Sequence, residues 1–380
     1  MVGVAVATLA VFPANAYAIA SWTAQVSGTT WNLNAMAFPD ATHGWVVGEG
    51  GTILVTTDGG AHWTPQRAGT HHQLFSVAFP DATHGWAVGT AGTILATTDG
   101  GAHWTLQKSG VPYHTYWSVA FPDATHGWAV GDNDVILATT DAGTHWTLQT
   151  LGSNFGPQTD DWLRSVAFPD ATHGWAVGGD GIILATTDAG VHWTAQKSGT
   201  GWDLMSVAFA NSTDGWAVSN GGDILATADG GRHWTPQKSH TTNMLFSVAF
   251  PDATHGWAVG GDGIVLATTD AGAHWTAQRS GITAGSEQEF KSGVGVSYER
   301  IDSLNSVAFP DATHGWAVGD GGAITAYNGP APAALPSLGG GGVNPVIAWC
   351  IALLLVLLAV GGGIILRSRR RAKLSAETHS

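Results

Sequence analysis

The sequence predicts an all-β protein: a seven-bladed β-propeller closed by the N-terminal strand, plus one C-terminal transmembrane helix. Three observations lead to this fold class. The first is a repeat of about 41 residues. The second is that the seventh copy lacks its last strand, while the N-terminus contains a segment that matches it. The third is a long apolar run near the C-terminus.

The composition is that of a folded chain with an acidic balance. Hydrophobic residues make up 44% of the 380 residues and charged residues only 11%, which argues against disorder. The single cysteine, Cys350, excludes a disulfide framework. The net charge of −14 disfavours binding of nucleic acid through a basic surface.

The chain begins with an apolar segment, residues 1–18, that has features of a secretory signal peptide. It ends in Ala-Asn-Ala-Tyr-Ala, a series of small residues of the kind at which signal peptides are cleaved. We therefore expect the following residues to be exported.

A repeat fills residues 19–328, the predicted propeller. Each copy contains the phrase Phe-Pro-Asp-Ala-Thr-His-Gly-Trp or a close variant, and a period near 41 is typical of propeller blades. The seven phenylalanines are Phe38, Phe79, Phe121, Phe168, Phe209, Phe250 and Phe309.

Each copy contains four short β segments separated by turn residues. In the second copy these segments are residues 76–79, 85–89, 93–97 and 103–107. Four strands in 40 to 45 residues are the pattern of one blade.

The seventh copy has no fourth segment after residues 323–327. Residues 21–25, Ser-Trp-Thr-Ala-Gln, match the fourth segment at 192–196, His-Trp-Thr-Ala-Gln. We therefore expect the N-terminus to provide the outer strand of the last blade, which closes the ring and removes the open edges that an unclosed stack would expose.

Six copies carry the pattern T-x-D-x-G-x-x-W between the third and fourth segments. The aspartate is expected to accept backbone N–H groups across the turn, the glycine to adopt a positive φ, and the tryptophan to cover the hairpin. These structural aspartates are Asp58, Asp99, Asp141, Asp188, Asp229 and Asp270.

This element resembles the Asp-box, or BNR, repeat of sialidases, sortilin-type receptors and xyloglucanase-type glycosidases. The whole copy, with Gly-Trp-Ala-Val-Gly before the box, is similar to the photosystem II assembly and stability factor family over residues 20–328. The resemblance implies a lumenal or periplasmic seven-bladed propeller with a role in photosynthesis. The chain departs from that family in its apolar C-terminal segment and in its few arginines, where a basic patch is expected.

Strand parity divides the loops between two faces of the propeller. The turns 1–2 and 3–4 of each copy are nearly invariant from copy to copy and share one face, here called the constant face. The loops 2–3 and 4–1 differ between copies and share the variable face, which also carries insertions around 152–161 and 283–302. Residues outside the repeat pattern are where a specific function can be placed.

Aromatic and charged residues on the variable face are the candidate partner-binding residues, because this mixture is typical of recognition surfaces. The alternative for the aromatic residues is that they cap the inner strands and fill the mouth of the channel. Five basic residues are expected at the rim of this face, where they would guard exposed edge strands: Arg67, Lys108, Lys197, Lys238 and Arg279. The partner-binding candidates are Trp31, Phe75, Tyr113, Tyr116, Trp117, Phe155, Asp160, Asp161, Trp162, Arg164, Trp202, Asp203, Phe246, Tyr298 and Arg300.

The sequence predicts no cofactor, no metal site and no enzymatic activity. Most histidines recur at two turn positions on a wide ring, so they cannot converge on one metal ion; His71, His72 and His114 form the one irregular group. A sialidase needs a cluster of arginines that this propeller lacks. A glycosidase needs a defined pair of carboxylates, and no spacing selects such a pair.

The C-terminal region predicts a membrane anchor. Residues 329–345 form a Gly/Pro-rich linker, and the apolar residues 346–366 would span about 31 Å as a helix, enough to cross a bilayer. The basic tail, residues 367–380, is expected to stay in the cytoplasm, which places the propeller outside it. The expected location is the cell membrane, with a single pass.

The expected function is a protein-binding scaffold or assembly factor for a membrane complex. The alternative is a glycan-binding or glycoside-hydrolysing Asp-box propeller, and a surface adhesin is a third possibility. A deep cleft with paired acids would favour the glycan alternative.

Overall fold

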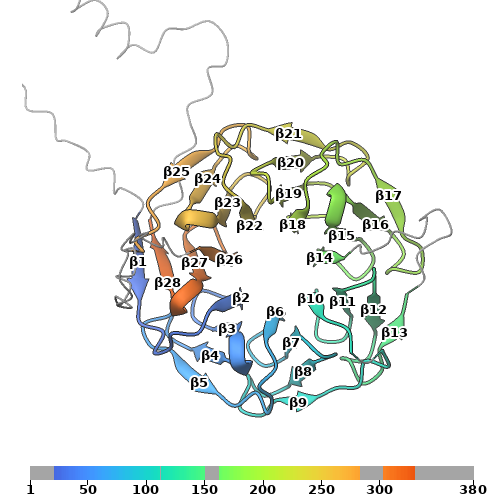
Figure 1. The fold of residues 1–380 in the computed structure, drawn as a ribbon, viewed down its shortest axis with the longest axis vertical. Helices are drawn as coiled ribbons and strands as arrows, with labels where there is room; N and C mark the ends of the chain where they lie inside the picture. The colour runs from blue at the N-terminus through green and yellow to red at the C-terminus, as the bar shows by residue number, and fades with distance from the viewer. Residues whose placement is uncertain (1–20, 112, 150–161, 283–302, 330–380) are drawn as a thin grey trace, which may run out of the picture. The chain divides into compact units, whose positions relative to one another are not determined.

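The computed structural model is a ring of seven four-stranded antiparallel sheets around a common axis (Figure 1). It describes residues 21–111, 113–149, 162–282 and 303–329, which lie within one compact unit. In six sheets the strand order follows the chain from the axis outward. The predicted seven-bladed, all-β fold is confirmed.

Blades are numbered here by the copy of the repeat that they contain, and their strands are given from the axis outward. Blades 1 and 2 consist of β2 (Leu33–Ala37), β3 (Gly44–Gly48), β4 (Ile53–Thr56) and β5 (Thr64–Gln66), then β6 (Leu74–Ala78), β7 (Gly85–Gly89), β8 (Ile94–Thr97) and β9 (Thr105–Leu106). Blades 3 and 4 consist of β10 (Tyr116–Ala120), β11 (Gly127–Gly131), β12 (Ile136–Thr139) and β13 (Thr147–Leu148), then β14 (Leu163–Ala167), β15 (Gly174–Gly178), β16 (Ile183–Thr186) and β17 (Thr194–Gln196). Blades 5 and 6 consist of β18 (Leu204–Phe209), β19 (Gly215–Ser219), β20 (Ile224–Thr227) and β21 (Thr235–Gln237), then β22 (Leu245–Ala249), β23 (Gly256–Gly260), β24 (Val265–Thr268) and β25 (Thr276–Gln278). Blade 7 consists of β26 (Leu304–Ala308), β27 (His314–Gly319), β28 (Ile324–Asn328) and β1 (Ser21–Gln25).

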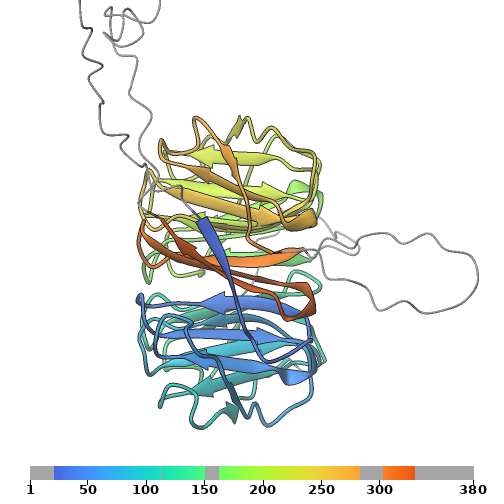
Figure 2. The same ribbon diagram turned by 90° about the vertical axis from the view of Figure 1, so that its left-hand side faces the viewer.

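The N-terminal strand closes the ring. β1 pairs with β28 in an antiparallel register that places Trp22 opposite Tyr327 and Gln25 opposite Ile324. Figure 2 shows β1 in dark blue beside the red β28. The predicted closure is therefore confirmed.

Repeated backbone hydrogen bonds define the two faces. On one face, the 3–4 turn bonds to the 1–2 turn of the same blade, as in Gly100 N–H to Thr83 O at 2.8 Å. On the other face, the 2–3 loop bonds to the segment that enters the inner strand, as in Thr90 N–H to Gln73 O at 3.0 Å. Four of these 2–3 loops contain a short 3-10 turn: η1 (Glu49–Gly51), η2 (Gly179–Gly181), η3 (Gly261–Gly263) and η4 (Asp320–Gly322). The division into a constant and a variable face is thus confirmed.

The recurring phenylalanine locks neighbouring blades together. The ring of Phe121 stacks on Trp86 of the preceding blade, with centroids 3.5 Å apart, and meets Trp146 edge-on at 5.9 Å. A side chain at Gly127 would overlap the Phe121 ring, so this glycine is required by close packing and not by its φ. The second strand of each blade is buried along its whole length, except for His314 at the start of β27, because both of its faces are covered by adjacent sheets.

The predictions about the ends of the chain lie outside the described residues. They concern the signal peptide at 1–18, the linker beyond residue 329, the span at 346–366 and the tail at 367–380. Within the described ranges, no helix is long and apolar enough to cross a membrane.

Candidate functional site at the mouth of the channel

Each inner strand carries a β-bulge at its second residue. In blade 2, Leu74 pairs with Gly89 and Ser76 pairs with Val88, so Phe75 between them has no partner in the ladder. A bulge of this kind redirects a side chain away from the regular alternation of a strand. The same shift occurs in all seven blades, at Asn34, Phe75, Trp117, Arg164, Met205, Phe246 and Asn305.

The seven bulge residues converge on one pocket around the axis of the ring. The pocket has a volume of about 370 Å³, and Gln73 and Asp320 complete its lining. Because Asp320 belongs to a 2–3 loop, the pocket opens at the variable face. We call it the channel-mouth pocket.

Three of the bulge residues form a continuous stack. The rings of Phe75 and Trp117 lie 4.3 Å apart between centroids, and the Arg164 guanidinium carbon lies 4.2 Å above the Trp117 ring. A cation over an indole face is attracted by the ring quadrupole, the more so when it is partly desolvated. Blades 2, 3 and 4 thus present one aromatic and cationic wall.

Two acids hold this wall in place. Asp132 accepts a hydrogen bond from the Trp117 indole at 2.7 Å and another from the Thr115 backbone at 3.1 Å. Burial lowers the pKa of Arg164, and the charges of Asp132 and Asp203 oppose this shift. Arginine stays protonated under such conditions, so the wall keeps its positive charge.

Two asparagines line the pocket at blades 7 and 1, next to Phe75 of blade 2. The side-chain amide of Asn34 donates to Leu74 O at 2.7 Å. That of Asn305 donates to Leu33 O at 3.0 Å and to Asp320 at 3.1 Å. These amides tie adjacent inner strands together, and they give the pocket a polar section between Phe246 of blade 6 and Phe75 of blade 2.

The structure brings four of the predicted partner-binding residues into the pocket: Phe75, Trp117, Arg164 and Phe246. They lie in the inner strands, which begin two residues earlier than expected, and not in the 4–1 loops. This matches the alternative that aromatic residues fill the mouth of the channel. Asp203 lies beside the pocket, where it accepts from the Asn220 side chain at 2.9 Å.

The remaining described candidates lie elsewhere. Trp31, Trp162 and Trp202 are exposed on the variable face, by 57%, 42% and 56%, and Tyr113 is 90% exposed. The prediction that Tyr116 belongs to the partner-binding surface is corrected by the structure. Tyr116 is fully buried and occupies the core position that leucine fills in the other blades. Five candidates lie outside the described residues: Phe155, Asp160, Asp161, Tyr298 and Arg300.

Sequence reasoning missed Asn34, Met205, Asn305, Asp132 and Asp320. A usable signal was present for the first three. The residue after the recurring leucine varies between copies, whereas the next residue is always alanine or serine.

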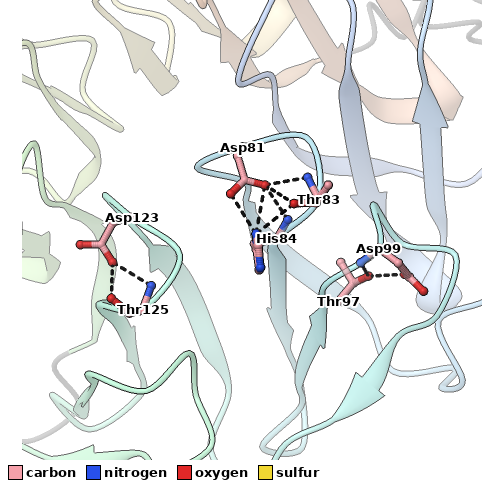
Figure 3. A network of polar contacts seen from close by, with 7 residues as sticks. All are labelled: Asp81, Thr83, His84, Thr97, Asp99, Asp123 and Thr125. Atoms are coloured by element: carbon pink, nitrogen blue, oxygen red, sulfur yellow. Dashed lines mark hydrogen bonds and ion pairs between the residues drawn. The ribbon is translucent and has the colours of Figure 1, made fainter.

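The constant face is a network of paired aspartates and histidines (Figure 3). Asp81 accepts from the backbone of Thr83 at 2.7 Å and of His84 at 2.8 Å, and its second oxygen lies 2.9 Å from the His84 ring. Partial burial raises the pKa of Asp81, but these hydrogen bonds outweigh it and hold the pKa well below its usual range. The turn is therefore fixed by an ionised carboxylate.

The Asp box behaves as predicted at its aspartate and glycine. Asp99 accepts from the His103 backbone and the Thr97 hydroxyl, each at 2.9 Å, and Gly101 has a φ of +88°. The hydrogen bond from the His103 side chain, followed by that from its backbone, lowers the pKa of Asp99 to about 2. The box tryptophan Trp104 bonds to Gln66 of the preceding blade at 3.1 Å and meets the Phe79 ring of its own blade edge-on, so it links the two blades.

Within the described ranges, no three histidine, cysteine or acidic side chains could share a metal ion. His72 of the irregular group contacts the Thr93 hydroxyl at 2.8 Å instead.

The seven sheets form a closed ring, and the outer hairpins of six of them carry an Asp box. The channel-mouth pocket, which is lined by residues that differ between copies, lies on the axis. These features define an Asp-box β-propeller. The family model described as "Photosynthesis system II assembly factor YCF48" matches residues 14–75, 66–116, 107–198, 153–238, 197–278 and 233–300. The chain belongs to this family. No curated protein matches the sequence.

Solved structures share the fold at low sequence identity. One described as "YCF48 bound to D1 peptide" is 21% identical, with a TM-score of 0.63, over 83% of this chain and 97% of that one. YCF48 from Cyanidioschyzon merolae is 21% identical, with a TM-score of 0.63, over 81% and 98%. A catalytically inactive virginiamycin B lyase from Staphylococcus aureus is 13% identical, with a TM-score of 0.67, over 81% and 99%. The similarity to the lyase means that the fold alone does not decide between binding and catalysis.

Proposed function

We propose that this protein is a non-enzymatic assembly factor that holds a segment of a partner protein at the channel-mouth pocket. The observation that carries the proposal is the convergence of seven bulge residues, none of them fixed by the repeat, on one pocket. The partner would be a subunit of a membrane complex, as the family description suggests. The structure described as YCF48 bound to a D1 peptide supports a peptide ligand for a propeller of this kind.

The pocket has the preorganisation that peptide binding requires. Trp117 is fixed by Asp132 on its edge and by Phe75 and Arg164 on its faces. A rigid aromatic anchor loses little conformational entropy when it packs against a partner, which is why tryptophan is frequent among residues that dominate binding energy.

Glycoside hydrolysis is less well supported by the described residues. A general acid needs a raised pKa, whereas each described aspartate with a resolved shift has a lowered one. Asp132 and Asp203 accept hydrogen bonds that position neighbouring groups. Their roles are accounted for without catalysis.

Trp117→Ala tests the proposal. We expect capture of partner proteins from solubilised membranes by the full-length chain to weaken by about 2 kcal/mol, or roughly 30-fold. Val191→Ala is the control, because Val191 is 63% exposed in a 3–4 turn of the constant face and does not line the pocket. Equal capture by both variants, with unchanged thermal transitions, would contradict the proposal.

We also propose that residues 346–366 anchor the protein in the cell membrane with the propeller outside the cytoplasm. The supporting observations are the apolar run and the basic residues that follow it. An epitope tag within residues 283–302 should be accessible to antibody on intact cells. A tag that is detected only after permeabilisation would contradict this arrangement.

A further inference from the structure

The charges on the variable face are sorted by distance from the axis. Here the inner zone means the 2–3 loops together with Asp203 and Arg164, and the outer zone means the segments that follow the fourth strands. The described part of the inner zone contains eight acids and one arginine, a net charge of −7. Its acids are Glu49, Asp132, Asp134, Asp180, Asp203, Asp223, Asp262 and Asp320. The outer zone holds the exposed basic residues Arg67, Lys108, Lys197, Lys238 and Arg279.

The turn geometry does not require the acids at positions 180 and 262. Asp180 and Asp262 are exposed middle residues of η2 and η3, with φ of +52° and +55°. Glycine, which tolerates a positive φ at no steric cost, occupies the same position in η1 and η4, at Gly50 and Gly321. These two carboxylates therefore add charge to the face without being needed for the backbone of their turns.

Exposed indoles lie next to these acids. Trp31 packs near Gly50, the chain neighbour of Glu49, and Trp202 packs over Gly221 and directly precedes Asp203. Trp162 forms a backbone bridge with Asp132. An aromatic face beside a carboxylate suits a lysine or arginine side chain, which gains from both the ring quadrupole and the ion pair.

We infer that the segment held at the channel-mouth pocket is basic: an apolar or aromatic residue enters the pocket, and lysine or arginine residues on either side contact the inner zone. This inference rests on the proposed function and adds the chemistry of the partner. The apolar anchor would pack against Phe75, Trp117, Met205 and Phe246. The basic outer zone would repel the same segment from the rim and so direct it to the axis.

Three peptides of equal length test the inference with the full-length chain. Each has a central Leu-Trp-Leu, flanked on both sides by Lys-Lys, Glu-Glu or Ser-Ser, and binding is measured by fluorescence anisotropy. At low salt we expect the lysine peptide to bind about tenfold or more tightly than the glutamate peptide. The difference should shrink in 1 M NaCl, where the Debye length is about 3 Å.

Variants assign the preference to the inner zone. Asp180→Asn/Asp262→Asn should reduce the preference for lysine, and asparagine is suited to the positive φ at both positions. Asp214→Asn is the control, because Asp214 lies in a 1–2 turn on the constant face, and it should leave the preference unchanged.

Failure of the inference differs from failure of the proposed function. If Trp117→Ala weakens all peptides but the glutamate peptide binds as well as the lysine peptide, the basic partner is wrong and the pocket stands. A lysine preference that responds to Asp214→Asn and not to the inner-zone variant also overturns the inference. If no peptide binds, or if Trp117→Ala changes nothing, both proposals fail.

Discussion

At the scale of single residues, the threonine that opens each Asp box joins the aspartate to the backbone of the turn. The Thr97 hydroxyl donates to Asp99 at 2.9 Å and accepts from the backbone of Gly101 at 2.9 Å. The side chain is only 3% exposed, so water cannot replace these bonds. The aspartate that names the box is thus oriented by a buried hydroxyl.

Thr97→Val keeps the volume of the side chain and removes the hydroxyl. Because the buried Gly101 N–H then has no acceptor, we expect the free energy of unfolding to fall by about 1–3 kcal/mol in urea titration. Thr98→Val changes the exposed neighbouring threonine and should have almost no effect. Equal unfolding midpoints for the two variants would show that the hydroxyl does not stabilise the box.

The roles of some residues could be predicted from the sequence, and the roles of others could not. Asp58 and its five equivalents could be assigned because Asp-box chemistry is local, within a few residues of one turn. Tyr116 could not be assigned to the core, because the sequence does not show whether an aromatic residue at a leucine position points inward or outward. The role of Asp132 could not be assigned, because its bond to Trp117 joins a loop residue to an inner strand that is distant in the sequence pattern.

At the scale of strands, the inner strand of each blade departs from the simple alternation of side chains between the two faces of a sheet. The closing strand β1 keeps this alternation. The start of β6 was hard to predict because two consecutive apolar residues, Leu74 and Phe75, do not alternate. The bulge places Leu74 in the core and Phe75 in the channel-mouth pocket. β1 was recognisable because its sequence repeats that of the other fourth strands.

Trp22 is the main contact of the closing strand. Its ring lies 5.8 Å from Phe309 and 5.5 Å from Tyr327, and its indole N–H donates to Gln278 at 2.9 Å. Trp22→Ala should lower the free energy of unfolding by about 3–5 kcal/mol, because it leaves a cavity where the ring closes. Calorimetry would measure this change, with Val26→Ala as a control at a position that is 87% exposed. A loss below about 1 kcal/mol would mean that the closing strand contributes little to stability.

At the scale of the whole molecule, the count of blades and the closure followed from the repeat, since each blade buries its faces only against its neighbours. The arrangement of charge did not follow from the repeat alone. To predict where the charges lie, each loop has to be assigned to a face and to a distance from the axis. Only the closed ring provides this information.

Acid should destabilise the entire ring. Hydrogen bonds from His103 and Thr97 lower the pKa of Asp99 to about 2 in the folded chain. Burial raises the pKa of Asp123, but hydrogen bonds from Thr125 and His126 outweigh it and bring that pKa to about 2 as well, against about 3.9 when unfolded. Their contribution to stability is therefore complete above roughly pH 4 and is lost as the pH falls toward 2. We expect the urea midpoint to fall between these values, and Asp99→Asn to lessen the slope. A midpoint that is constant from pH 5 to pH 2.5 would contradict this assignment.

The unpaired second residue of each inner strand separates recognition from architecture. Asn34 and Asn305 also bond to the backbone of a neighbouring inner strand. The other five positions take no part in the ladder of their own sheet, so they can change during evolution without altering the fold. A combinatorial library with these five codons randomised should yield mainly soluble propellers whose ligand preference differs from clone to clone.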